Sequence, residues 1–447
     1  MNGANPRRIA VDILNRVDAE GAHAEPLLDA ALTGAGLRTP ADRGLLTELV
    51  YGTLRVRGSL DWVVAALYRG NAAALDTAVL NILRTGLYQL QFTDRIPPFA
   101  AVNEAVALAR ALVPAAAGLV NAVLRAFLRR GESIAWPDMA KHPAQAIAVR
   151  HSHPRWLVER LLADTGVEEA VAICRANNAI PPATLRVNTL KTSREEAITT
   201  LAAEGISAAP ARFSPDGVIL ASPAAALRQS TAYRSGLLRI QDEASQLIAH
   251  LVAAAPGDRV LDLCAGAGGK TLHLAALMEN RGSVTAVDRE PRQLAMLRAE
   301  ADRLGVTIVQ TRAGDAAAAI VPLRETFDRV LLDAPCSGLG TLRRNPEIRW
   351  RVTLADVGRC AELQHALLAR AAGYVRPGGR LVYSVCTVTP EENEEVIGAF
   401  LRLRADFTLL PLSGVSPALL NAAGYFRSAP HLHGADGFFA AALLRGA

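Results

Sequence analysis

The most informative stretch of this chain reads Val260-Leu-Asp-Leu-Cys-Ala-Gly-Ala-Gly-Gly-Lys-Thr271. An apolar run leads into a glycine-rich loop, and residues that favour a helix follow the loop. Glycine lets the backbone approach a ligand closely, and the first N–H groups of a helix are free to bind that ligand. This order predicts a strand, a ligand-binding loop and a helix, with the ligand at the carboxyl end of the strand.

On both sides of this stretch, short apolar runs alternate with amphipathic segments. Strands are expected at residues 259–263, 283–287, 307–311, 329–332 and 380–384. Helices are expected at residues 271–278, 291–304, 354–374 and 391–404. This alternation predicts an α/β fold with a mainly parallel, doubly wound sheet. The runs 407–410 and 438–444 predict two late strands that pair antiparallel.

The spacing of the glycines separates three kinds of nucleotide site. Thr271 stands where a dinucleotide-binding G-x-G-x-x-G loop would have its third glycine after Gly266 and Gly268. The G-x-x-x-x-G-K spacing of a phosphate-binding loop is also absent here. A ligand with ribose and adenine but no pyrophosphate fits better, so we expect S-adenosylmethionine as the cofactor.

Three carboxylates follow successive expected strands. Asp288 comes 20 residues after Gly268 (288 − 268) and is placed to accept hydrogen bonds from ribose hydroxyls. Asp315 follows the third strand, where it can reach the adenine edge, and Asp333 follows the fourth. The alternative is that these acids only cap helices and turns.

Two cysteines follow strands downstream of this loop. Cys336 lies in Asp333-Ala-Pro-Cys-Ser-Gly338, and Cys386 lies in Tyr383-Ser-Val-Cys-Thr387. Carbon 5 of a pyrimidine becomes nucleophilic when a thiolate adds to carbon 6, and Asp333 would stabilise the charge that develops on the ring. A methyl donor, a thiol and a carboxylate together predict methylation of a pyrimidine carbon. The residues alone do not choose the attacking thiol, and one catalytic cysteine beside one buried bystander is an alternative.

The chain divides into three regions by pattern. Residues 1–135 predict an all-helical domain, because apolar residues such as Ile9, Ile13 and Val17 recur on one helix face. Residues 136–240 predict a small α+β domain, interrupted by prolines, that binds RNA or bridges its neighbours. Residues 241–447 predict the methyltransferase domain.

Composition limits the class of protein. Hydrophobic residues make up 51% and charged residues 20% of the chain, which is typical of a globular protein. The net charge of +5 permits nucleic-acid binding without demonstrating it. The five cysteines form no C-x-x-C pair, so we expect reduced thiols, no disulfide framework and no metal. With no signal peptide and no long apolar run, we expect a soluble, cytoplasmic monomer without a membrane partner.

The two cysteine motifs and the glycine loop resemble the Nol1/Nop2/Sun family of RNA cytosine-5 methyltransferases. Other stretches resemble its bacterial Sun-type branch, which methylates small-subunit ribosomal RNA, and these are His153–Trp156, Leu185–Asn188, Ile240–Gln246 and Pro390–Glu394. Asp42–Gly52 and Gly118–Arg125 resemble the NusB-like RNA-binding domain of that branch. The resemblance implies a Rossmann-like methyltransferase domain, an all-α NusB-like domain and a small α+β linker domain. It also implies that the partner is RNA, above all 16S ribosomal RNA.

The resemblance assigns roles to particular residues. Cys386 would attack carbon 6 of the cytosine, and Cys336 would help the product to leave. The cofactor contacts that it implies are Cys264, Ala265, Gly266, Ala267, Gly268, Gly269, Lys270, Asp288, Asp315 and Asp333. The family loop usually reads Cys-Ala-Ala-Pro-Gly-Gly-Lys, whereas this chain has Gly266-Ala267 in place of Ala-Pro. Losing the proline costs rigidity, but the Gly-Gly-Lys end persists, so we expect the cofactor to bind.

Two further expectations concern RNA and the remaining cysteines. Arg343, Arg344, Arg349 and Arg351, with Trp350 among them, suit phosphate contacts and base stacking at the mouth of the site, although a solvated surface loop is the alternative. Arg125, Arg129 and Arg130 could extend a phosphate-binding edge. Cys264 is expected to pack within its loop, and Cys174 and Cys360 are expected in helix cores. Rival functions are a transfer-RNA or DNA cytosine-5 methyltransferase and a non-catalytic RNA-binding assembly factor.

Overall fold

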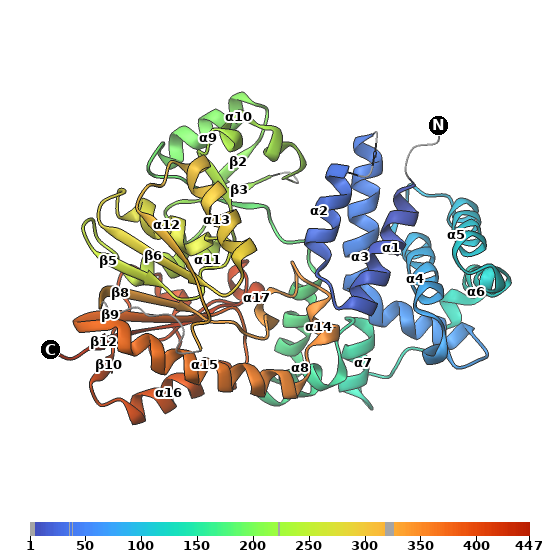
Figure 1. Cartoon of the computed structure of the whole chain (residues 1–447). Coiled ribbons are helices and arrows are strands. Elements are labelled where there is room, and N and C mark those ends of the chain that lie inside the picture. Colours follow the sequence, from blue (N-terminus) through green and yellow to red (C-terminus); the bar gives the residue numbers. More distant parts are fainter. Residues whose placement is uncertain (1–4, 35, 38, 222–223, 318–325) are drawn as a thin grey trace. The chain divides into compact units, whose positions relative to one another are not determined.

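The computed structural model describes residues 5–34, 36–37, 39–221, 224–317 and 326–447. These residues form two compact units (Figure 1). The helical unit comprises residues 1–179 together with Leu342–Arg351, and the sheet unit comprises residues 180–341 and 352–447. The predicted boundaries at residues 135 and 240 stay predictions. Among the described residues, no helix is long and apolar enough to cross a membrane.

The helical unit is all α, as the sequence predicts for its first part. Its helices are α1 (Pro6–Glu20), α2 (Ala24–Gly34), α3 (Pro40–Leu67), α4 (Thr77–Phe92), α5 (Pro98–Leu112), α6 (Ala117–Arg130), α7 (Pro143–Arg150), α8 (Arg155–Asn178) and α14 (Ile348–Arg351). Helix α1 shows how the sequence sets a boundary: the Asn5 side chain accepts hydrogen bonds from the first free N–H groups, and Gly21 ends the helix with φ 62°. The apolar faces of α1, α3 and α4 meet in one core.

The arginine-rich segment after Cys336 belongs to the helical unit. Arg349 is fully buried, and its guanidinium donates to Asn178 Oδ1 (2.6 Å) and to the Ser152 carbonyl (3.0 Å). Arg343 is also buried, and the ring of Trp350 lies so close to Gly58 that a Cβ there would come within 2.7 Å of it. The prediction that Arg343 and Arg349 contact RNA at the mouth of the site is therefore wrong. Trp350 and Arg344 are half-buried and Arg351 is exposed, so their predicted contacts with RNA stay predictions. A buried arginine needs fixed acceptors, and the helices supply them.

The sheet unit contains a small antiparallel sheet, which we call the small sheet, with strand order β2-β3-β1-β4. Its strands and adjoining helices are β1 (Thr184–Val187), α9 (Arg194–Ala203), β2 (Ala208–Pro210), β3 (Gly217–Leu220), α10 (Thr231–Arg234) and β4 (Leu238–Ile240). The sequence predicts a small α+β domain in this region, and the structure has both helices and strands here. Strands β2 and β4 have only three residues each, which is too few to show an alternating pattern.

The main sheet has strand order β10-β12-β9-β8-β5-β6-β7, with β11 beside β12. Its strands are β5 (Arg259–Asp262), β6 (Ser283–Asp288), β7 (Val309–Ala313), β8 (Phe327–Asp333), β9 (Val375–Val385), β10 (Phe407–Leu409), β11 (Phe426–Arg427) and β12 (Phe439–Arg445). Strands β5 to β9 are parallel, and β12 pairs antiparallel with both β9 and β10. The predicted parallel sheet and late antiparallel pair are confirmed.

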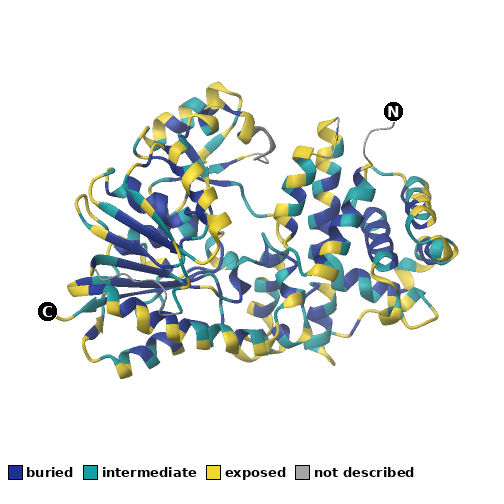
Figure 2. Cartoon of the chain, in the orientation of Figure 1, coloured by how far each residue is buried: buried dark blue, intermediate teal, exposed yellow. Residues whose placement is uncertain are grey.

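Helices cover both faces of the main sheet (Figures 1 and 2). They are α11 (Glu243–Val252), α12 (Gly269–Leu277), α13 (Pro291–Leu304), α15 (Leu354–Tyr374), α16 (Glu394–Leu403) and the short α17 (Pro430–His433). Along β5, Val260 packs into the core under α11 and α12, whereas Leu261 packs into the core under α15. Successive strand residues point to opposite faces, so a continuous apolar run fills two cores.

The register of the parallel strands brings their carboxyl ends together. Asp333, the last residue of β8, lies opposite Ser384 of β9, and Asp288 of β6 lies opposite Ala313 of β7. The loops that leave β5, β6, β8 and β9 therefore start at one edge of the sheet. In doubly wound sheets this edge is where ligands bind.

Candidate active site

The glycine loop joins β5 to α12 and depends on glycine at two positions. Gly266 and Gly268 have φ values of 53° and 79°, a region that residues with a side chain rarely adopt. A Cβ on Gly268 would also lie 2.5 Å from Leu297 Cγ, so only glycine fits there. Gly268 directly precedes α12 and has no side chain that could cap the helix. The first N–H groups of α12 therefore stay open to a ligand at this position.

Asp288 shapes this loop from the end of β6. Its Oδ2 accepts a hydrogen bond from the Gly266 N–H (2.8 Å), and its Oδ1 accepts one from the Glu290 N–H (2.8 Å). Asp315 is exposed and accepts from the Ala317 N–H (2.8 Å). Both acids do cap turns, yet each carboxylate oxygen keeps a lone pair for a ligand. Their expected cofactor contacts stay predictions.

Asp333 sits between a cation and a hydroxyl. Lys270 Nζ lies 2.6 Å from Asp333 Oδ2, and Ser384 Oγ donates to Asp333 Oδ1 (2.6 Å). Lys270 is only 8% exposed, so its ammonium is held at this carboxylate. The sequence predicted Lys270 and Asp333 as site residues but not this ion pair, which orients Asp333 from two sides.

The two thiols meet at the ends of β8 and β9. The Sγ atoms of Cys336 and Cys386 are 3.3 Å apart. Cys386 directly follows β9, and Cys336 comes three residues after the end of β8. The hydrogen bond with Cys386, together with burial, raises the pKa of the Cys336 thiol well above its ordinary value. Cys336 therefore stays protonated near neutral pH. A protonated thiol is a poor nucleophile but can exchange a proton.

Glu392 is a residue of this site that sequence reasoning missed. It is fully buried, and its Oε1 accepts hydrogen bonds from the Ser337 N–H (2.8 Å) and from Gln364 Nε2 (3.0 Å). Its Oε2 accepts from the hydroxyls of Thr389 (2.7 Å) and Thr387 (3.1 Å). No cation pairs with it in these contacts, so the donors hold its charge in place of water.

These contacts place Glu392 between the two cysteine loops. Ser337 follows Cys336 directly, and Thr387 follows Cys386 directly. One carboxylate thus holds the backbone of one loop and the side chain of the other. The sequence signal was present in Pro390–Glu394, which the family resemblance singled out without giving it a role.

Asp262, the last residue of β5, is a second missed residue. It is buried, and Thr271 Oγ1 donates to its Oδ2 (2.7 Å). Burial, with a smaller contribution from the charge of Asp333, raises the pKa of Asp262 to about 7. A carboxyl group that titrates near neutral pH beside a glycine loop is characteristic of functional sites. Its position inside an apolar run hid it from the sequence pattern.

The other three cysteines are not members of the thiol pair. Cys264 lies in the glycine loop, and burial raises the pKa of its thiol, which fits a packing role. Cys174 is fully buried in α8, as predicted. Cys360 is half-buried on α15, so the prediction that it belongs to a helix core is wrong.

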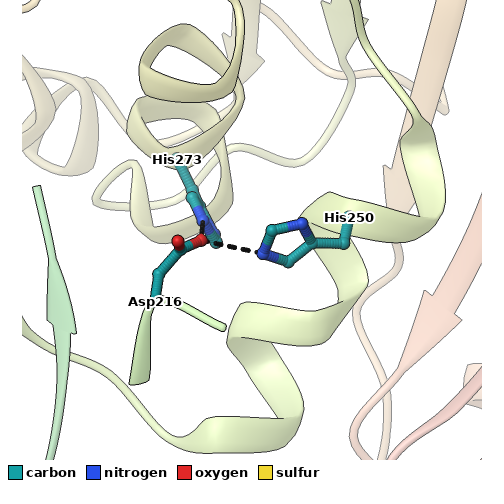
Figure 3. A group of neighbouring side chains, drawn as sticks. All are labelled: Asp216, His250 and His273. Atoms are coloured by element: carbon teal, nitrogen blue, oxygen red, sulfur yellow. Dashed lines mark hydrogen bonds and ion pairs between the residues drawn. The ribbon is translucent and has the colours of Figure 1, made fainter. Parts of the chain in front are cut away.

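A separate polar cluster lies where the small sheet meets α11 and α12 (Figure 3). It consists of Asp216, His250 and His273, whose ligand atoms lie within 4.8 Å of one another. Both imidazole Nε2 atoms bond to the same carboxylate oxygen, Asp216 Oδ2, at 2.8 Å from His250 and 3.0 Å from His273. Two imidazoles and a carboxylate are donors that a transition-metal ion accepts, but here they already satisfy one another.

Comparisons with known families match all three regions of the chain. The description "16S rRNA methyltransferase RsmB/F" matches residues 249–444, "NusB family" matches residues 4–129, and an RsmF/B-like ferredoxin-like domain matches residues 153–226. These matches confirm the predicted combination of a NusB-like domain, a small linker domain and a methyltransferase domain.

Relatives of known name are similar over nearly the whole chain. A "Probable ribosomal RNA small subunit methyltransferase B" of Bacillus subtilis is 37% identical over 98% of this chain and 98% of its own length. The "Ribosomal RNA small subunit methyltransferase B" of Pseudomonas syringae pv. tomato is 38% identical over 99% of this chain and 97% of its own length.

Solved structures agree with the sequence comparisons. The crystal structure of PH0851 superposes with a TM-score of 0.84 and is 29% identical, covering 98% of each chain. The structure of NSun6 from Pyrococcus horikoshii with SFG, an analogue of S-adenosylmethionine, has a TM-score of 0.59 and 25% identity. It covers 65% of this chain and 98% of its own.

Proposed function

The chain belongs to the RsmB/F family of 16S rRNA methyltransferases, and on that premise we propose that it methylates carbon 5 of a cytosine in 16S ribosomal RNA. S-adenosylmethionine is the cofactor and, when bound, supplies an electrophilic methyl group. The observation that carries the proposal is the pair of sulfur atoms 3.3 Å apart beside a carboxylate held by Lys270 and Ser384. Methylation at nitrogen or oxygen requires no thiol, whereas methylation of this ring carbon does.

Cys386 is the proposed nucleophile. Its thiolate forms a bond to carbon 6 of the cytosine, and the electron pair of the 5,6 double bond becomes available at carbon 5. The raised pKa of Cys336 argues against that thiol as the nucleophile, because a thiol that stays protonated attacks poorly. Cys386 also follows directly on β9, whose register with β8 supports its approach to the Asp333 side of the site.

Asp333 is the proposed partner of the cytosine ring. Its carboxyl group would share a proton with ring nitrogen 3, which lowers the energy of the electron-rich ring formed by thiolate addition. Lys270 and Ser384 orient this carboxyl group, so little reorganisation is needed when the charge develops. Lys270 thus contributes to catalysis through Asp333 as well as lying next to the cofactor loop.

Cys336 is proposed to act after methyl transfer. The proton on carbon 5 must leave, and the bond between Cys386 and carbon 6 must break with its electron pair returning to sulfur. Cys336 Sγ is at hydrogen-bonding distance from Cys386 Sγ, so Cys336 can give its proton to the departing sulfur and, as a thiolate, accept the proton from carbon 5. Glu392 keeps both cysteine loops together during the cycle.

The cofactor-binding residues proposed here are those of the glycine loop and the strand ends. They are Cys264, Ala265, Gly266, Ala267, Gly268, Gly269, Lys270, Asp288, Asp315 and Asp333. The positive-φ glycines and the uncapped start of α12 support this assignment. Asp288→Ala should weaken binding of S-adenosylmethionine in a calorimetric titration, and an unchanged affinity would contradict its role.

The reaction is tested by incubating the purified protein with S-adenosylmethionine and 16S rRNA or undermethylated small subunits. Nucleoside mass spectrometry should find 5-methylcytidine, and bisulfite sequencing of rRNA from cells lacking the protein should show one cytosine that is no longer protected. Transfer RNA from the same cells is the control. If protection were lost in transfer RNA alone, transfer RNA and not 16S rRNA would be the substrate. A methylated base other than cytosine would contradict the proposed reaction.

A further inference from the structure

Two arginines of the small sheet bind the backbone of the glycine loop. Arg186, on β1, donates from Nη1 to the Gly269 carbonyl at 2.6 Å. Arg239, on β4, donates from Nη2 to the Ala267 carbonyl at 3.0 Å. Neighbouring strands of one sheet thus hold carbonyls on both sides of Gly268.

Both guanidinium groups also contact side chains outside the glycine loop. Arg186 is 1% exposed and also donates to Gln241 Oε1 at 2.6 Å. Burial lowers the pKa of Arg186 to about 9, so the side chain is still charged at neutral pH. Arg239 Nη1 lies 3.5 Å from Glu300 Oε1, an ion pair that uses a different nitrogen from the Nη2 that donates to the loop. Hydrogen bonds from charged donors are stronger than those from neutral ones.

The Asp216 cluster provides a third connection between the small sheet and α12 (Figure 3). Asp216 directly precedes β3, whereas His273 lies on α12 one turn beyond Lys270. Because both imidazoles bond to one carboxylate oxygen, each Nε2 carries the proton and donates it. The cluster therefore ties the small sheet to the body of α12.

A metal ion at this cluster would conflict with its surroundings. With Nε2 bound to a metal, the proton of His273 would move to Nδ1, which is buried and has no hydrogen-bond partner. Burial and the positive charge of Arg186 already lower the pKa of His273, and the charge of a metal ion would add to that of Arg186. The three side chains are better suited to an anchor made of hydrogen bonds than to a metal site.

Fixing the carbonyls also fixes the N–H groups of the loop. A trans peptide is planar, so holding the Gly269 carbonyl toward Arg186 turns the Lys270 N–H to the opposite side. This N–H belongs to the first turn of α12, where a ligand of the loop binds. The loop also has Ala267 where the family usually has proline, and Arg239 holds that same residue.

We propose that the small sheet forms part of the cofactor site, with Arg186 and Arg239 as positioning residues that keep the glycine loop in its binding conformation. Asp216 assists by anchoring α12 through His273. This inference rests on the proposed function only in taking the glycine loop as the site of S-adenosylmethionine. It gives the small sheet a role in cofactor binding, besides any contact that the sheet makes with RNA.

The test uses the full-length protein and measures S-adenosylmethionine binding by calorimetry, without RNA. Arg239→Gln should weaken binding about tenfold, the effect of losing one charged hydrogen bond. Arg239→Lys, which retains the charge, should restore part of the affinity. The matched control is Arg212→Gln, since Arg212 is an exposed arginine of the same small domain and should bind normally.

Kinetics separate positioning from general damage to the fold. Arg239→Gln should raise KM for S-adenosylmethionine by the same factor, leaving kcat at saturating cofactor within about twofold and KM for RNA unchanged. Asp216→Asn should weaken cofactor binding less than Arg239→Gln, because an amide oxygen still accepts one imidazole proton. Neither assay depends on which base is methylated, so failure of the cytosine assignment would leave this test intact.

Two results would overturn the proposal. One is wild-type affinity for S-adenosylmethionine in Arg239→Gln, and the other is an equal loss of affinity in Arg212→Gln. Stoichiometric zinc binding to the purified protein that is lost in Asp216→Asn would overturn the anchor and make the cluster a metal site.

Discussion

The sheet unit contains two places where reactive side chains from different elements converge, and they differ in how their polar atoms are used. At the thiol pair, Cys336 and Cys386 face each other at 3.3 Å while Glu392 satisfies the neighbouring Ser337 and Thr387. At the Asp216 cluster, the three side chains satisfy one another directly.

The difference separates a reactive site from a structural one. Around the thiols, the buried Glu392 carboxylate accepts hydrogen bonds from Ser337 and Thr387 in the two cysteine loops. Neither sulfur atom bonds to this carboxylate in those contacts, so both can take part in the reaction. Around Asp216, both imidazole Nε2 protons are donated to the carboxylate, so neither is available to a substrate. Convergence of residues is common to both clusters, so the unused bonding capacity is what distinguishes them.

The strongest way to break this comparison is to remove the proposed nucleophile. Cys386→Ala should lower turnover by a factor on the order of 10⁴ or more, because the carbon–sulfur bond cannot form. A radiolabelled methyl-transfer assay with RNA measures the loss, and denaturing electrophoresis should find no protein–RNA adduct. Cys360→Ala is the control, since Cys360 is a half-buried cysteine on α15 that is not a member of the pair.

Removing the second thiol should have the opposite effect on the adduct. Cys336→Ala should also lose turnover, but it should accumulate a protein–RNA complex that survives denaturation, because addition and methylation proceed while release fails. Denaturing electrophoresis with labelled RNA measures the complex. An adduct in Cys386→Ala instead of Cys336→Ala would reverse the two roles.

A smaller effect is expected when the carboxylate between the loops is neutralised. Glu392→Gln replaces an acceptor by a donor among five donor groups, so kcat should fall by roughly 10²-fold as the thiols lose their alignment. Calorimetric affinity for S-adenosylmethionine should stay unchanged. Glu395→Gln, at an exposed position on α16, is the matched control. A normal kcat in Glu392→Gln would mean that the carboxylate between the cysteine loops does not align the thiols.

The smallest effect concerns stability at the Asp216 cluster. Burial, together with the charge of Arg186, lowers the pKa of His273 to about 3, against an ordinary value of 6.5. Between these values the unfolded chain binds a proton that the folded chain does not, so the free energy of unfolding falls as pH falls below 6.5. His273→Gln, which keeps a donor, should reduce this dependence by up to about 1.4 kcal/mol per pH unit.

Urea denaturation at several pH values between 4 and 8 measures this slope. The control is His365→Gln, because His365 is exposed on α15 and should leave the slope as it is in the parent protein. An unchanged slope in His273→Gln would mean that His273 contributes nothing to acid sensitivity.

The fold was largely predictable because local signals agreed with the final packing. The apolar run into Gly266 and Gly268 placed β5 and α12, and the helix at Pro291–Leu304 has the predicted bounds. The prediction failed where tertiary contacts override local character. Arg349 has the appearance of a surface residue, yet helices distant in sequence supply buried acceptors for it.

For the candidate site, the sequence indicated the reactive side chains but not the residues that position their loops. Thiols and strand-end acids have few structural roles, so Cys336, Cys386 and Asp333 could be singled out by type. Glu392 and Arg239 act through contacts with loops that are remote in sequence, and their residue types are common on protein surfaces. Only the folded chain shows that they are committed to those loops.

The 3.3 Å separation of the sulfur atoms also has a consequence for oxidation. Hydrogen peroxide converts a thiolate to a sulfenic acid, and a neighbouring thiol then condenses with it to form a disulfide and water. Whichever of Cys336 and Cys386 is oxidised first, the other provides the thiol for this condensation. Mild oxidation should therefore convert the enzyme to an inactive disulfide form. A thiol reductant should regenerate both thiols and restore activity. A single cysteine in the same place would instead be open to irreversible oxidation to the sulfinic or sulfonic acid.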